Sequence, residues 1–313
     1  MLGDCGEAET SPRDVVMIGA PWCEGQNLEG ADLAPLAMRE AGVAEAVQSL
    51  GLVFKDAGDV DFSSVAPRDH DGQADHHYSV ASYREWLGSG SHDNFATFMR
   101  KRTTASATSA SALRRKRSYE SALSEKAQCN VVNAELMGAG LRLVHNAVQK
   151  AVNASASPER SPFVLTVGGD HSIASGSISA LIARYPSLGV VWVDAHADAN
   201  TPRSSPSGHY HGMPAAHLLG WFEKAGEMGE GVNQDALRGF DWFKAGCLAE
   251  SKLAYIGLRD VDPEEGKSKQ MPGHARTRCL QPPPLGAPLT TMRSALNSAA
   301  PLGREGLHDA RRR

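Results

Sequence analysis

The stretch Val190-Val191-Trp192-Val193-Asp194-Ala195-His196-Ala197-Asp198 decides the fold. It is an apolar run that ends in three side chains able to bind a metal ion. Alternate residues of an extended strand point to the same side, so Asp194, His196 and Asp198 are expected to converge. Open α/β sheets bind ligands at the carboxyl ends of their strands, and two carboxylates with an imidazole suit Mn²⁺, Fe²⁺ or Zn²⁺. The stretch therefore predicts a metal site at one edge of a parallel sheet.

A second strand end adds to this prediction. Residues 162–167 are expected to form a buried strand, which is followed by Gly168-Gly169-Asp170-His171-Ser172. The glycines allow a tight turn, and the polar residues of the turn can cap a helix expected over residues 173–185. A single histidine in a turn is usually a surface residue. His171, however, is expected at the same sheet edge as the first motif, which favours metal chemistry, whereas Asp170 is interpreted as structural or as a residue that supports a metal ligand from behind.

The composition is that of an ordinary globular protein. Its 313 residues are 41% hydrophobic and carry a net charge of −4, which gives no overall signal for nucleic-acid binding. No apolar run reaches the roughly 18 residues that a membrane span needs, and residues 1–13 lack the apolar segment of a signal peptide. The cysteines are widely spaced without a CxxC pair and are expected to be reduced thiols in the cytoplasm. They are Cys5, Cys23, Cys129, Cys247 and Cys279.

Hydrophobic spacing outlines one α/β domain over residues 14–265. Short apolar runs predict buried strands at residues 14–19 and 52–56. Residues 33–50 have helical spacing, with expected core contacts at Leu36, Val43 and Val47. Residues 119–152 show a strong amphipathic helical pattern, with expected core positions at Leu136, Leu141, Leu143 and Val148.

The domain is interrupted by a segment of different composition at residues 63–119. This segment is dominated by Ser, Ala, His and charged residues and includes the basic run Arg114-Arg115-Lys116-Arg117. Such a run fits a nuclear-localisation or phosphate-binding patch. A solvated, disordered insertion is the favoured interpretation, because the segment has too few apolar residues to build a core.

Four segments together resemble the ureohydrolases, the binuclear manganese enzymes that include arginase, agmatinase and formimidoylglutamase. They read IGAPWCEGQNLEGADLAPLAMREAGV, VGGDHS with WVDAHADANTP, SGHYHGMPAAHLLG, and YIGLRDVDPEE. The set is fairly specific for arginase, and the resemblance covers residues 15–62 and 119–265. It implies a three-layer α-β-α fold with a mainly parallel sheet. It also implies a homotrimer acting on L-arginine in the cytosol or the mitochondrion.

The resemblance assigns a role to each candidate metal ligand. His171 would bind the more buried manganese, Asp194 would bridge both ions, His196 would bind the second, and Asp198 would return to the first. The two ions would lower the pKa of a water molecule and give hydroxide near neutral pH. Attack on the guanidinium carbon of L-arginine would then yield urea and L-ornithine.

The same resemblance implies residues for proton transfer and substrate binding. Asp198 would pass a proton to the leaving amine, and His211 would exchange protons with solvent, which suits an imidazole. The α-carboxylate and α-ammonium of arginine would be held by Asn200, Ser207, Asp262 and Glu265. Asn200, Ser207 and Asp262 also fit simple turns. His209 stands where arginases usually have asparagine, which changes one carboxylate contact.

The sequence departs from the family after Asp262. The family has a further strand ending in an Asp-x-Asp pair, which completes both metal sites, and no such pair follows Asp262 here. Residues 267–313 contain no Val, Ile, Phe, Tyr or Trp, although buried parallel strands are rich in these residues. Residues 266–313 are therefore expected to be a disordered, basic tail, and an altered reading frame is one hypothesis for the break.

The departure predicts an incomplete parallel sheet, because the family's late strands lie between those that carry His171 and Asp194. Weak metal binding and little or no activity follow as expectations for this chain. Two alternatives stay open beside arginase. One is agmatinase or another ureohydrolase, and the other is a catalytically inactive relative with a binding or regulatory role.

Overall fold

The computed structural model describes residues 14–26, 30–65, 131–154, 161–222 and 237–260, and the backbone of residues 279–280. It divides into two compact units, one of residues 1–188 with 198–247 and one of residues 189–197 with 248–313. The expected insertion at 63–119 lies outside the described residues except for 63–65, and the expected tail at 266–313 lies outside them except for 279–280.

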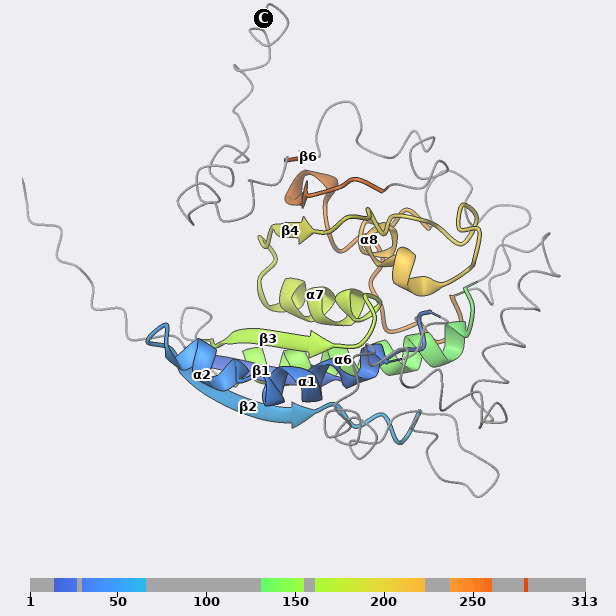
Figure 1. Cartoon of the computed structure of the whole chain (residues 1–313). Helices are drawn as coiled ribbons and strands as arrows, with labels where there is room; N and C mark the ends of the chain where they lie inside the picture. The colour runs from blue at the N-terminus through green and yellow to red at the C-terminus, as the bar shows by residue number, and fades with distance from the viewer. Residues whose placement is uncertain are drawn as a thin grey trace, which may run out of the picture. The chain divides into compact units, whose positions relative to one another are not determined.

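The first unit contains a parallel sheet with the strand order β2-β1-β3. Its strands are β1 (Asp14–Ala20), β2 (Val53–Asp59) and β3 (Phe163–Gly168). Figure 1 shows the short helices α1 (Ala34–Glu40) and α2 (Val43–Gln48) on one face of this sheet and α6 (Ala134–Val152) on the other. Helix α7 (Ile173–Arg184) packs along α6. This is the layered α/β arrangement that the sequence predicts.

The register of this sheet brings two loops together. Residues 15–20 of β1 pair in order with residues 163–168 of β3, so the carboxyl ends of both strands lie at the same edge. The Gly169 N–H donates to the Ala20 carbonyl at 2.9 Å, and the Asp170 N–H donates to the Trp22 carbonyl at 2.8 Å. The loop after β1 and the turn after β3 are therefore joined by backbone hydrogen bonds.

Helix α6 buries a narrower stripe than its pattern predicts. The side chains with no exposed surface are those of Met137, Leu141, Val144, Val148 and Val152. Leu141 and Val148 agree with the expected core, whereas Leu136 and Leu143 are only half-buried. The buried residues are spaced three or four apart, so one stripe faces the core and the two leucines flank it.

The helix expected over residues 33–50 is broken. A 3-10 turn, η1 (Ala31–Leu33), leads into α1, and α2 begins only at Val43. Gly42 lies between the two helices with φ 84°, a left-handed conformation that glycine adopts without a Cβ clash. Val43 is buried as expected, whereas Leu36 and Val47 are half-buried.

The second unit contains another parallel sheet with the order β4-β5-β6. Its strands are β4 (Val190–Val193), β5 (Leu253–Ile256) and the two-residue β6 (Cys279–Leu280), which falls within the expected tail. Trp192 and Tyr255 are cross-strand neighbours whose ring centroids lie 6.3 Å apart. Within the described parts of the chain, β3 is an edge strand of the first sheet and β4 an edge strand of the second.

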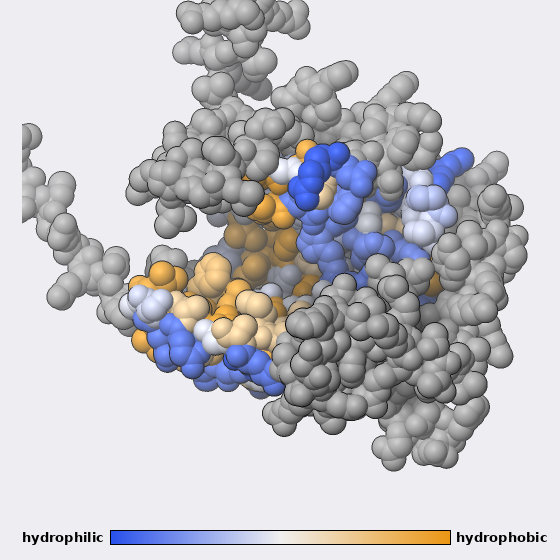
Figure 2. Space-filling view, in the orientation of Figure 1, coloured by the Kyte–Doolittle hydropathy of each residue, from blue (hydrophilic) through white to orange (hydrophobic). Residues whose placement is uncertain are grey.

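No described helix is long and apolar enough to cross a lipid bilayer. Apolar and polar surface lie side by side over α1, α2 and β2 in Figure 2. Apolar residues with substantial exposure in this region include Met38, Leu50 and Val53. The exposed polar residues of β2 include Lys55, Asp56 and Asp59.

Candidate metal and proton-transfer site

The chain does not stay extended through the metal-ligand motif, so the expected alternation beyond Val193 is wrong. Strand β4 ends at Val193, and the His196 N–H turns back to donate to Oδ1 of Asp194 at 2.9 Å. Asp198 has φ 48°, which is the left-handed region. The carboxylate of Asp194 competes with strand pairing by bonding its own backbone two residues on, as aspartates do in turns.

In the second unit, β4 and β5 position the start of this motif. The Asp194 N–H donates to the Ile256 carbonyl at 3.0 Å and so continues the β4–β5 pairing by one residue. His196 is exposed, and its ring nitrogens lie 3.4 Å from an Asp194 oxygen and 3.5 Å from an Asp260 oxygen. Asp260 is thus a carboxylate next to His196 that the motif alone does not reveal.

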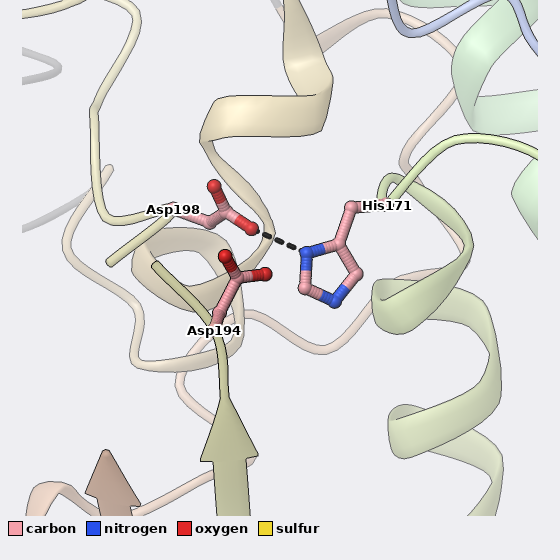
Figure 3. Close-up of side chains that lie close together, drawn as sticks. All are labelled: His171, Asp194 and Asp198. Atoms are coloured by element: carbon pink, nitrogen blue, oxygen red, sulfur yellow. Dashed lines mark ion pairs between the residues drawn. The ribbon is translucent and has the colours of Figure 1, made fainter. Parts of the chain in front are cut away.

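In the first unit, the structure brings together His171 and Asp198. Nδ1 of His171, in the turn between β3 and α7, lies 2.5 Å from Oδ2 of Asp198 (Figure 3). The Asp198 side chain is only 8% exposed, and the Ala215 N–H fixes its carbonyl at 2.9 Å. Oδ2 is nevertheless buried without accepting a hydrogen bond from any described residue.

This contact fits a cation. A carboxylate oxygen and an imidazole nitrogen at 2.5 Å repel each other unless a proton or a metal ion lies at their lone pairs. A buried carboxylate oxygen without a donor is costly and calls for such a partner. Asp198 also keeps a left-handed φ, and backbone strain of this kind is concentrated at functional sites. His171, Asp194 and Asp198 each offer one nitrogen or oxygen of the kind that binds Mn²⁺ or Zn²⁺.

Asp170 organises the turn that carries His171. Its buried carboxylate accepts hydrogen bonds from the Gly25 N–H at 2.8 Å, from the Ser172 N–H at 2.9 Å, and from the Ser172 hydroxyl. Burial raises the pKa of Asp170, and these hydrogen bonds oppose the rise. The structural role expected for Asp170 is consistent with these contacts. Ser172 precedes α7 but caps it without a side-chain hydrogen bond.

His211 lies in a 3-10 turn, η3 (Tyr210–Gly212), and faces the same loop. Its Nδ1 is 2.9 Å from the Gly25 carbonyl oxygen, and its backbone N–H donates to the same oxygen at 3.1 Å. Because a carbonyl oxygen only accepts, Nδ1 carries a proton. The neutral ring therefore leaves its lone pair on Nε2, which is the nitrogen available for proton exchange.

The loop between Asp198 and His211 holds the residues expected to bind the substrate carboxylate. Oδ1 of Asn200 accepts from the Ser204 hydroxyl at 2.9 Å, and the Ser207 hydroxyl accepts from the His209 N–H at 3.2 Å. Both residues thus take part in turns, which is the second interpretation of their sequence. Burial, and then the nearby His211, lower the pKa of His209 to about 4, so His209 is neutral at pH 7. Asp262 and Glu265 lie outside the described residues.

The sequence prediction missed three side chains beside η3, namely Ser175, Tyr210 and His217. The Tyr210 hydroxyl lies 2.8 Å from the Ser175 hydroxyl and 2.7 Å from Nδ1 of His217. All three are buried. A polar residue such as His217 within the apolar run of helix α8 (Pro214–Leu218) is the one sequence signal that suggests a buried hydrogen-bond partner.

Comparisons with known proteins show the family. The chain is 33% identical over 255 residues to human "Arginase-2, mitochondrial", which covers 82% of this chain and 52% of that protein. It is 44% identical over 134 residues to the arginase of Saccharomyces cerevisiae, covering 43% of this chain and 36% of that one. The chain thus spans about half or less of the length of the curated relatives it matches.

The fold resembles those of solved structures. The solved structure of native arginase from Bacillus caldovelox superposes with a TM-score of 0.57 at 23% identity, covering 92% of this chain and 71% of that one. The three-layer α-β-α class with a parallel sheet is therefore confirmed. The model of the arginase family matches residues 13–280, which extends beyond the expected domain end at 265 and includes β6. The chain belongs to the arginase family.

Proposed function

We propose that this chain carries out arginase chemistry, the hydrolysis of L-arginine to urea and L-ornithine, and that it does so weakly. The observation that carries the proposal is the pair formed by His171 and the donor-free oxygen of Asp198. The four sequence segments and the family match support the reaction class. L-Arginine as substrate and a homotrimer are proposals drawn from the family.

The proposed metal ligands are His171, Asp194, His196 and Asp198. His171 and Asp198 belong to the first unit, and Asp194 and His196 belong to the second. When bound, Mn²⁺ supplies hydroxide near neutral pH by lowering the pKa of water. The Asp198 carboxylate lies against the His171 ring and is buried, so water has little access to its oxygens.

The residues of this chain also supply the proton transfers. We propose that Asp198 takes up the proton of the attacking hydroxide oxygen and passes it to the leaving nitrogen as the C–N bond breaks, so that urea forms and ornithine leaves with a neutral amino group. His211 exchanges protons with solvent through Nε2 while the Gly25 carbonyl holds its Nδ1–H in place. Asn200 and Ser207, with Asp262 and Glu265, are the proposed contacts of the α-carboxylate and α-ammonium.

Two observations favour a low rate. No Asp-x-Asp pair follows Asp262, so the ligand set proposed for two ions holds only four side chains. In addition, the strands that precede His171 and Asp194 are edge strands of separate sheets within the described residues. A strand that is paired on one side alone holds its ligands less firmly than a strand paired on both sides, and loosely held ligands bind metal weakly. A ureohydrolase-like binding protein without catalysis is the second candidate, favoured by these same observations.

One experiment separates the candidates. The purified chain is incubated with excess Mn²⁺, and urea release is measured from L-arginine and from agmatine, with bound metal counted by mass spectrometry. We expect slow release from L-arginine, little from agmatine, and fewer than two ions per chain. An Asp198→Asn variant should lose the activity, whereas the exposed Asp241→Asn control should keep it. Absence of urea at saturating Mn²⁺ would reject catalysis in favour of a binding role, and preference for agmatine would indicate agmatinase.

A further inference from the structure

A trio of buried, hydrogen-bonded side chains lies behind the turn that carries His211. The Tyr210 hydroxyl lies 2.8 Å from Ser175 Oγ on α7 and 2.7 Å from Nδ1 of His217 on α8. Ser175 and Tyr210 have no exposed surface, and His217 is 2% exposed. The trio therefore connects η3 to two helices at once, and none of its members has a part in the proposed chemistry.

The environment of His217 makes this a neutral hydrogen-bond network. Burial lowers the pKa of His217 to about 3, so its ring carries a single N–H at pH 7. The ring stacks on Phe222 with centroids 4.4 Å apart and packs against Phe243 at 4.1 Å. With apolar neighbours on these sides, Nδ1 of His217 depends on the Tyr210 hydroxyl as its hydrogen-bond partner, and a buried polar group left unpaired is destabilising.

The backbone transmits this constraint to His211. Tyr210 and His211 are consecutive residues of η3, and the Met213 N–H closes the turn by donating to the Tyr210 carbonyl at 2.8 Å. The Tyr210 ring also stacks on Phe240 with centroids 5.0 Å apart. A backbone rotation that breaks the Tyr210 hydrogen bonds would therefore also turn the His211 ring away from the Gly25 carbonyl.

We infer that Tyr210 is a positioning residue for His211. By fixing η3 between α7 and α8, it directs Nδ1 of His211 at the Gly25 carbonyl and thereby reserves Nε2 for proton exchange. The inference rests on the proposed role of His211 in proton transfer. It does not require that a metal ion be bound, because none of the side chains that hold η3 and the His211 ring is a proposed metal ligand.

The test is the tautomer of His211 in metal-free protein, read from long-range ¹H–¹⁵N NMR spectra of the histidine rings. The wild type is expected to show mainly the Nδ1–H form. In Tyr210→Phe, which keeps the ring and removes the hydroxyl, the population should shift toward Nε2–H, the form that free histidine favours. Ser175→Ala should shift it in the same direction by a smaller amount. A purely structural role would lower stability and leave the tautomer unchanged.

Tyr255→Phe is the matched control, because its buried hydroxyl donates to the Ala197 carbonyl at 2.8 Å in the second unit. It should lose a similar hydrogen bond without changing His211. An unchanged tautomer in Tyr210→Phe, or an equal change in the control, would overturn the inference. If Tyr210→Phe does not fold, Ser175→Ala and His217→Phe, which keeps an aromatic ring but removes Nδ1, decide by the same criterion. A chain that releases no urea but shows the expected tautomer shift would contradict the proposed function and support the positioning role.

Discussion

Replacing Asp170 should loosen the loop after β1 by a predictable amount. The Asp170→Ala change removes the acceptor of two buried backbone donors, Gly25 N–H at 2.8 Å and Ser172 N–H at 2.9 Å. Each unpaired buried donor costs about 1–3 kcal/mol, so the gross loss is about 2–6 kcal/mol. Burial raises the pKa of Asp170 and so opposes its charge, and relief of that cost partly offsets the loss. We expect a net destabilisation of about 2–3 kcal/mol.

Asp170→Asn tests the same reasoning with almost no change in volume. An amide keeps one acceptor oxygen but presents its NH₂ group to one of the two backbone donors. It should therefore cost roughly half as much as alanine, about 1–1.5 kcal/mol. The exposed Asp241→Ala change is the control and should stay within about 0.5 kcal/mol of the wild type.

The assay is hydrogen exchange at the Gly25 amide, which reports the free energy of local opening. Urea denaturation followed by circular dichroism gives the accompanying change in overall stability. The opening free energy should fall in the order wild type, Asp170→Asn, Asp170→Ala. If Gly25 exchanges at the wild-type rate in Asp170→Ala, the carboxylate does not hold this loop and the reasoning is refuted.

Three further predictions concern separate parts of the chain. Arg39→Ala removes the two hydrogen bonds from the guanidinium to the Asp56 carboxylate (2.6 and 2.9 Å), which lower the pKa of Asp56. The stability that this pair contributes to the wild type should be present above pH 3.8 and lost as the pH falls through the lowered pKa. Because the pair is partly exposed, the substitution should lower the unfolding free energy by less than about 1 kcal/mol at pH 7 and by still less at pH 2, as measured by thermal melts. Equal losses at both pH values would contradict the prediction. Gly169→Ala places a Cβ 1.5 Å from the Trp22 carbonyl oxygen, so it should lower the melting temperature sharply, whereas Gly212→Ala meets nothing within 4 Å and should not. His171→Ala should abolish any rise in melting temperature that Mn²⁺ produces, and an unchanged rise would exclude His171 as a ligand.

Much of the fold follows from local patterns. Residues 162–167 predict β3 to within one residue at each end, because a mainly apolar run followed by two glycines is typical of a parallel strand, although the expected full burial is wrong for β3 within the described residues. The same reasoning fails at Gly42, where a left-handed residue splits the expected helix between helical segments of ordinary sequence. Helix breaks of this kind depend on packing against the sheet, which a periodic pattern does not encode.

The candidate site shows the same division. The position of His171 after β3 is predictable, because strand ends mark ligand-binding edges in α/β folds. The turn of Asp198 away from an extended path is not, because it depends on a left-handed φ and on a hydrogen bond from Ala215. The Tyr210 network is also invisible in the sequence, since its partner on α7 is 35 residues away.

The peptide groups of Gly25 have a consequence for the order of folding. The N–H of Gly25 is held by a residue 145 positions later, and its carbonyl by one 186 positions later. During synthesis, Gly25 therefore meets its first long-range partner only after residue 170 has left the ribosome, and its second only after residue 211. The free-energy cost of closing a loop, which is entropic, rises by only about 0.6 kcal/mol for each doubling of loop length. The length of chain between Gly25 and its partners thus delays their meeting more than it weakens it, and the bond from His211 is the last of these contacts to form.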